Sequence, residues 1–214
     1  MVGVIIALII GQAGGFGGYS AGIYRVNTSA VNKKLEAMAA PLVKTVFVQG
    51  GSGYSLVNNF MIGGYGLGGS KEVSKDSLKI KYGIGGGYFE VGYAKEILKG
   101  IFPFAMLGIG GFGEEVLISA TMDDVSWDSV WINPYREVKI SRGSFSVAPS
   151  AGIMIFPRNS FVGLMIKGSY NTIFTGSWEV GDGVKLADSP SSPYGFFTVN
   201  ASLIFGGIVY GKKN

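Results

Sequence analysis

Cysteine and histidine are both absent from the 214 residues of this sequence. The lack of cysteine excludes disulfides and thiol chemistry. The lack of histidine excludes serine–histidine and cysteine–histidine nucleophiles, and also imidazole metal ligands. A carboxylate pair is still available for acid–base chemistry, but we expect a protein that is not an enzyme and that uses no cofactor and no metal.

Charged residues and long apolar runs are also scarce. Charged residues make up 15% of the chain, and no segment approaches the roughly 20 apolar residues that a transmembrane helix needs. There are nevertheless 36 glycines and 13% aromatic residues, and the mean hydropathy of +0.34 is high for a domain with so little helix. Something other than water is therefore expected to cover much of the surface. If that cover is lipid, the chain must cross it as closed strands.

A basic stripe is missing as well. The formal net charge is +4, and the lysines are spread over turns, strands and both ends of the chain. Nucleic-acid binding is therefore not expected. The length suits a single β domain.

The N-terminal segment has two interpretations. An apolar run from Val2 to Ile10 is followed by Gly11-Gln12-Ala13, a small-x-small pattern that is typical of the end of a secretory signal peptide. On this interpretation residues 1–13 are the remnant of a signal peptide and residues 14–214 form the domain. The basic leading region of a signal peptide is missing, and the alternative is a first buried strand.

Eight strand-like runs follow, and their connectors alternate between short and long. Short turns therefore fall at one end of the predicted sheet and long loops at the other. The short turns are Val57 to Asn59, Lys95 to Gly100 and Pro157 to Ser160; the long loops are Asn27 to Lys44, Ser70 to Ser77, Thr121 to Ile140 and Thr172 to Tyr194.

The last two strands have the clearest period-two pattern, over Phe161 to Tyr170 and Phe196 to Tyr210. Period two over this length predicts strands with one apolar and one polar face. Pairing Leu164 with Leu203 keeps the apolar faces together, and a tight turn at Arg158-Asn159 would pair Leu164 with Ile153. We expect Leu164, Ile166, Leu203 and Phe205 to face lipid, and Lys167 and Asn200 to face the interior.

The run from Leu78 to Tyr93 is harder to interpret. Its apolar residues are even-numbered up to Ile84 and odd-numbered from Phe89, which predicts a bulge at Gly85-Gly86-Gly87. On that basis Lys79 and Lys81 point inward, with Lys81 opposite Glu114 or Glu115. Inward charges in a narrow barrel must pair or contact trapped water. The predicted interior polar residues are Lys79, Lys81, Glu90, Glu114, Lys167 and Asn200.

Two glycine motifs and one acidic loop are candidate sites. The GxGxxG matches at Gly64 to Gly69 and Gly108 to Gly113 lead into no convincing helix, so both are interpreted as strand glycines. Repeated Gly-Tyr steps suggest either rings lying over bare backbone or tolerance of small residues in a tight wall. Asp123, Asp124 and Asp128 could hold a calcium ion, although their spacing matches no EF-hand and a solvated acidic loop is the alternative.

A short helix is predicted in the first long loop. Asn27 or Thr28 can cap it, Pro41 ends it, and its apolar side is Val31, Leu35 and Met38.

With this apparent signal end, eight runs, short turns at one end and long loops at the other, the chain resembles the small eight-stranded bacterial outer-membrane β-barrels. The resemblance implies an all-β, antiparallel up-and-down barrel in the outer membrane, monomeric, with membrane lipid and the outer-membrane assembly machinery as partners. Two features depart from the pattern: Tyr210 is followed by Gly211-Lys212-Lys213-Asn214 rather than ending the chain, and Pro149 lies within a strand, where a bulge would accommodate it.

Three functions fit these features. The first is a non-enzymatic outer-membrane protein with a structural or surface-contact role. The second is a minor pore for small solutes, lined by Lys81, Glu90, Glu114 and Lys167. The third is a soluble barrel that binds an apolar ligand, which would need an apolar interior and a polar exterior.

Overall fold

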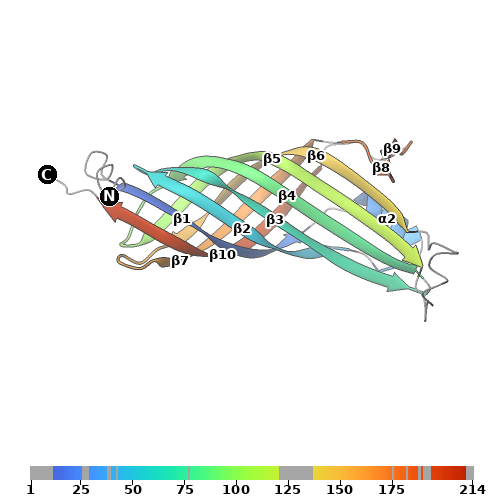
Figure 1. Ribbon diagram of the computed structural model, residues 1–214, viewed down its shortest axis with the longest axis horizontal. Coiled ribbons are helices and arrows are strands. Elements are labelled where there is room, and N and C mark those ends of the chain that lie inside the picture. The colour runs from blue at the N-terminus through green and yellow to red at the C-terminus, as the bar shows by residue number, and fades with distance from the viewer. Residues whose placement is uncertain are drawn as a thin grey trace, which may run out of the picture.

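In the part of the chain that the structure describes, eight long strands close into an antiparallel up-and-down barrel (Figure 1). This computed structural model describes residues 12–25, 29–37, 40–41, 43–76, 78–120, 137–174, 176–181, 183–187, 189 and 194–210. The barrel strands are β1 (Gln12–Arg25), β2 (Thr45–Val57), β3 (Phe60–Lys75), β4 (Leu78–Ala94), β5 (Ile101–Ala120), β6 (Val138–Ile155), β7 (Val162–Phe174) and β10 (Tyr194–Tyr210).

Each barrel strand pairs with the next, and β10 pairs with β1 to complete the closure. A small hairpin of β8 (Glu179–Val180) and β9 (Val184–Lys185) adds to β6 through Ile140 and Ser141. It lies within the predicted long loop from Thr172 to Tyr194. No helix among the described residues is long and apolar enough to cross a membrane.

The pairing of β7 with β10 follows the predicted register. Leu164 lies opposite Leu203, and Lys167 lies opposite Asn200. The pairing of β7 with β6 differs from the prediction by two residues, since Leu164 lies opposite Ile155 rather than Ile153. Strand β6 ends at Ile155; Phe156 is buried, and its amide donates to the Gly100 carbonyl at 2.7 Å. A shift of two residues leaves both faces unchanged.

The turn end of the barrel is the end at which β1 begins, on the left in Figure 1. Asn58 and Asn59 join β2 to β3 with φ angles of 48° and 72°. Two consecutive positive φ angles are typical of the type I′ turn, whose twist matches that of the strands it connects. The short turns 95–100 and 156–161 lie at the same end, where Arg158 contacts Glu96 at 3.2 Å.

At the opposite, loop end, the predicted long loop from Ser70 to Ser77 is wrong. Strand β3 continues to Lys75 and β4 starts at Leu78. These residues keep the strand period, with Val73 buried and its neighbours exposed, so the hairpin extends the wall. The helix α2 (Ser29–Ala37) lies at this end, and its Leu35 is buried among residues of the barrel interior. Met38 lies outside the described residues.

Strand β4 contains no bulge. Its pairing with β5 runs without interruption from Leu78 opposite Ala120 to Ala94 opposite Phe104, and the even-numbered residues face inward throughout. The prediction that Lys79 and Lys81 point inward is therefore wrong, and both are exposed on the outer wall. The apolar residues change faces because the surroundings of the strand change along its length, while the strand itself stays regular.

Pro149 is accommodated in a similar way. It faces outward on β6, and the ladder to β7 omits the pairs at Ala148 and Pro149 while keeping one register on both sides. The bulge predicted there is thus also absent. Strand β1 starts at Gln12, so Gln12 and Ala13, which the sequence places at the end of a signal peptide, are paired with β10; residues 1–11 lie outside the described residues.

The interior consists of two hydrophobic clusters. The turn-end cluster includes Phe16, Met61, Phe102, Met154 and Ile204. The loop-end cluster includes Tyr24, Tyr82, Phe112, Trp178 and Phe196. Polar side chains lie between the two clusters and toward the loop end. These polar side chains are the candidate functional residues.

Candidate functional site: charged groups in a filled lumen

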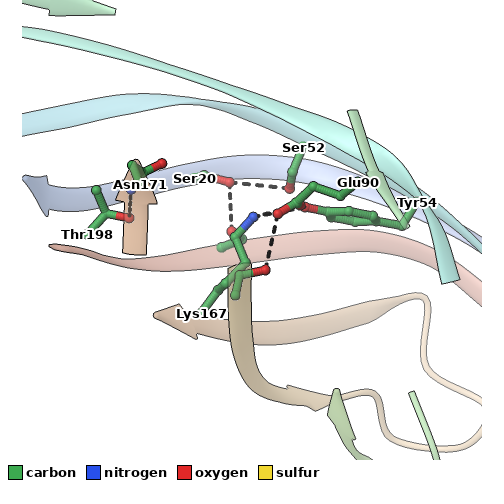
Figure 2. A network of polar contacts seen from close by, with 9 residues as sticks. Ser20, Ser52, Tyr54, Glu90, Lys167, Asn171 and Thr198 are labelled. Carbon is green, nitrogen blue, oxygen red and sulfur yellow. Dashed lines mark hydrogen bonds and ion pairs between the residues drawn. The ribbon is translucent and has the colours of Figure 1, made fainter. Parts of the chain in front are cut away.

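A buried ion pair crosses the barrel between the two hydrophobic clusters. Lys167 of β7 and Glu90 of β4 are 1% and 0% exposed, and the Lys167 Nζ lies 2.8 Å from the Glu90 Oε2. Figure 2 shows the two side chains pointing toward each other from different strands. The two residues are 77 positions apart in the chain, and closure of the sheet brings them together.

Neighbouring strands satisfy the remaining polar atoms of this pair. The Tyr54 hydroxyl of β2 donates to Glu90, and the Ser150 hydroxyl of β6 donates to the other Glu90 oxygen at 3.2 Å. The Lys167 ammonium also lies 3.3 Å from the centre of the Tyr65 ring, a cation–π contact. Side chains from four strands, β2, β4, β6 and β7, therefore meet at the Glu90 carboxylate, and they fill the lumen at this level.

Further buried polar side chains lie near the ion pair. Ser20 and Ser202 share a hydrogen bond of 2.6 Å, and the Ser52 hydroxyl lies 3.3 Å from Ser20 (Figure 2). The Asn171 amide donates to Thr198 at 3.3 Å. The Asn200 Nδ2 is buried without a hydrogen-bond partner among the described residues. Buried groups of this kind are the usual partners of internal water.

A second buried ion pair lies nearer the loop end. Arg142 of β6 binds Glu114 of β5, and both side chains are more than nine-tenths buried. The Tyr82 and Tyr194 hydroxyls also donate to Glu114. The Arg142 guanidinium lies between the Trp178 and Tyr194 rings, 4.6 and 4.7 Å from their centres. Through these contacts Arg142 of β6 holds Trp178, just before β8, and Tyr194 of β10 against the same side of the barrel.

The predicted interior residues thus divide into two groups. Glu90, Glu114, Lys167 and Asn200 are buried inside the barrel, whereas Lys79 and Lys81 are on the outer wall. Lys81 lies opposite Leu117, so the predicted contact with Glu114 is wrong; Glu114 pairs with Arg142 instead. The predicted lipid-facing residues Leu164, Ile166, Leu203 and Phe205 are 40 to 49% exposed on the outside.

Sequence reasoning missed the partners Arg142, Tyr54 and Tyr82. Arg142 has even-numbered parity on β6, in step with Ser146 and Ser150, and this pattern could have indicated its inward orientation. The two tyrosines fit an apolar face by their rings, but a buried hydroxyl usually finds a partner, and each of these donates to a buried glutamate. Asp123, Asp124 and Asp128 lie outside the described residues, and the described ones include no group of three or more acidic side chains that could hold a metal ion.

At the turn end, Glu96 connects several segments. Its carboxylate accepts hydrogen bonds from the Gly100 amide at 2.8 Å and from the Tyr210 hydroxyl at 3.2 Å, beside Arg158. Partial burial raises the pKa of Glu96, but these donors and the Arg158 charge outweigh it, so the pKa lies below its usual value. The carboxylate is therefore a structural link between turns.

No family model and no curated protein matches the sequence. Similar solved structures include two crystal structures of Ail, the attachment invasion locus protein of Yersinia pestis, one of them in complex with the heparin analogue sucrose octasulfate. Both have a TM-score of 0.46 and cover 91% of this chain and 99% of the Ail chain, at 12% and 13% identity.

Proposed function

We propose that this chain is a non-enzymatic barrel of a bacterial outer membrane that acts through its loop end, in contact with the exterior, and that its lumen does not conduct. The observation that carries the proposal is the distribution of polar and apolar residues on the two faces of the wall. It differs between the two halves of the barrel.

In the turn-end half, the outer face is apolar. Phe89, Leu107, Ile153 and Leu203 are 48 to 52% exposed, while Glu90 and Lys167 are buried inside. Membrane barrels have apolar side chains outside and polar ones inside, whereas soluble barrels that bind apolar ligands have the reverse. This half therefore supports a lipid environment and argues against the soluble alternative.

On the loop-end parts of β3, β4 and β5, apolar side chains face inward and lysines face outward. Val73, Ile80 and Val116 are buried inside, while Lys79 and Lys81 are exposed outside. This is the pattern of a sheet in water. It supports strands that continue beyond the membrane and present β3, β4, β5 and β6 together with α2 and the β8–β9 hairpin to the exterior.

The filled lumen argues against the pore alternative. A conducting channel needs continuous water, but the Glu90–Lys167 pair lies between two packed hydrophobic clusters. In planar bilayers we expect no stepwise conductance from the purified barrel. Reproducible steps that change in size with Lys167→Gln would support the pore instead.

The cysteine-free chain allows a direct test of location and orientation. Lys185→Cys places one thiol on β9, and Lys99→Cys places one at the turn end; both residues are exposed. A polymer-linked maleimide, too large to cross an outer membrane, should label Lys185→Cys in intact cells and Lys99→Cys only after lysis. If only Lys99→Cys were labelled in intact cells, the turn end would face the exterior, opposite to the proposed orientation. Recovery of both variants in the soluble fraction would contradict the proposal.

A further inference from the structure

Several inward glycines of the wall are approached closely by other atoms, whereas one group of outward glycines is not. A Cβ at the inward Gly18 or Gly110 would lie 1.9 or 2.0 Å from a backbone oxygen, so close packing demands glycine there. At the outward Gly87, Gly111 and Gly143, by contrast, a Cβ would meet no atom within 4 Å. The packing of the wall does not explain the outward glycines.

These outward glycines form a continuous surface across neighbouring strands. One row pairs Gly51, Gly66, Gly87 and Gly111 from β2 to β5, and a second pairs Gly68, Gly85, Gly113 and Gly143 from β3 to β6. We call these eight residues, with Gly83, the glycine shelf. Glycine weakens a strand because it costs backbone entropy and packs no side chain. Nine of them on one outer surface therefore indicate a requirement outside the wall.

The shelf opens into a cavity of about 620 Å³ on its loop-end side. Gly83, Gly85, Gly113 and Gly143 line the cavity, with Lys81 and Glu115 among the other lining residues. Toward the turn end, β4 and β5 continue from the shelf with the exposed apolar side chains Phe89 and Ile109. The cavity thus lies where the apolar outer surface changes to a charged one.

Among the described lysines near the cavity, Lys79 and Lys139 form salt bridges and Lys81 does not. Lys79 pairs with Glu72 at 3.1 Å, and Lys139 pairs with Glu115 at 2.6 Å. Lys81, by contrast, has no carboxylate within salt-bridge distance in the described part of the chain. The cavity therefore combines a surface of bare strand backbone with the ammonium of Lys81, which lies across the strand pair from Glu72 but forms no salt bridge among the described residues.

We propose that the glycine shelf binds one anionic lipid, with an acyl chain lying on the shelf and a headgroup phosphate at Lys81. A methylene chain gains van der Waals contact from a surface without side chains, as small residues allow close approach in other membrane contacts. The Lys81 ammonium, which forms no salt bridge among the described residues, complements the phosphate of such a lipid. The inference rests on the proposed membrane location.

Native mass spectrometry of the detergent-solubilised barrel tests this site. The probes are phosphatidylglycerol and phosphatidylcholine with the same acyl chains. We expect tighter binding of phosphatidylglycerol, and Lys81→Gln should lower its affinity about fivefold, the usual effect of one surface lysine on an anionic lipid. Gly113→Leu should weaken both lipids, because the new side chain occupies the shelf.

Two matched variants serve as controls. Lys95→Gln removes a charge at the turn end, and Gly168→Leu adds a side chain to the opposite wall, where a Cβ has 3.9 Å of clearance. Neither should change lipid binding. Heat-modifiable gel mobility verifies that each variant is folded.

Three results would overturn the inference: equal affinity for the two lipids, unchanged binding in Gly113→Leu, or a dimer that Gly113→Leu converts to a monomer, which would identify a second copy as the occupant. Failure of the proposed function would look different, because the chain would then not float with liposomes at all.

Discussion

At the scale of single residues, the Glu90–Lys167 pair shows how a closed barrel holds charge. Both side chains are removed from water, and their mutual contact with Tyr54 and Ser150 offsets the cost of desolvation. Such a pair adds little stability relative to apolar side chains of similar volume. Removing only one of the two charged side chains is costly, because the remaining buried charge then has no partner.

We therefore predict that Lys167→Met lowers the free energy of unfolding by about 3 to 5 kcal/mol, and that adding Glu90→Leu recovers a large part of the loss. Urea unfolding in lipid vesicles measures both values. Lys79→Met is the matched control, because Lys79 and Glu72 are 49% and 45% exposed and such pairs contribute about 1 kcal/mol or less. Equal and additive losses from Lys167→Met and Glu90→Leu would show that the pair is not coupled.

At the scale of elements, the local backbone decides where strands end. The β2–β3 turn requires positive φ at both Asn58 and Asn59, and asparagine tolerates that region better than other residues with a side chain. The Ala94 amide donates to the Asn59 carbonyl at 2.8 Å, so this turn also anchors the end of β4.

Replacing Asn58 by valine should therefore destabilise the barrel by about 1 to 2 kcal/mol, whereas Asn58→Gly should cost little, since glycine adopts positive φ freely. Unfolding midpoints of the two variants, compared with the unaltered protein, give the measurement. Indistinguishable midpoints for valine and glycine would mean that the turn is not under conformational constraint.

At the scale of the whole molecule, the outer wall changes character along the barrel. Toward the turn end it is apolar, with the Glu90–Lys167 pair inside; on the loop-end parts of β3 and β4 it is charged, with Val73 and Ile80 buried inside beside the Glu114–Arg142 pair. One regular ladder passes through both sections, as β4 demonstrates. The position of the change marks the level at which we place the membrane surface.

A charge introduced below that level should be costly. We expect Leu203→Arg, on the exposed apolar wall, to lower stability in lipid by about 2 to 4 kcal/mol if the site lies near the bilayer midplane, while Leu203→Ile should have little effect. Unfolding in vesicles tests the pair of variants. Arginine tolerated as well as isoleucine would place this wall in water.

The sequence by itself determined the all-β class, the closed meander, the faces of β7 and β10 and their mutual register. It could do so because those two strands alternate apolar and polar residues over a long stretch, and only one register keeps like faces together. Alternation reports that two faces differ. It does not report which of them lies inside.

Only the tertiary structure decided the orientation of Lys79 and Lys81 and the partners of Glu90 and Glu114. Period two looks the same whether the apolar side meets lipid or a packed interior, so in the sequence the change of faces along β4 resembles a bulge although the ladder is regular. The ion pairs join strands that are distant in sequence, and closure of the sheet sets their geometry. The physical reason is that burial and pairing of charge depend on the environment on both sides of the wall, which no single strand encodes.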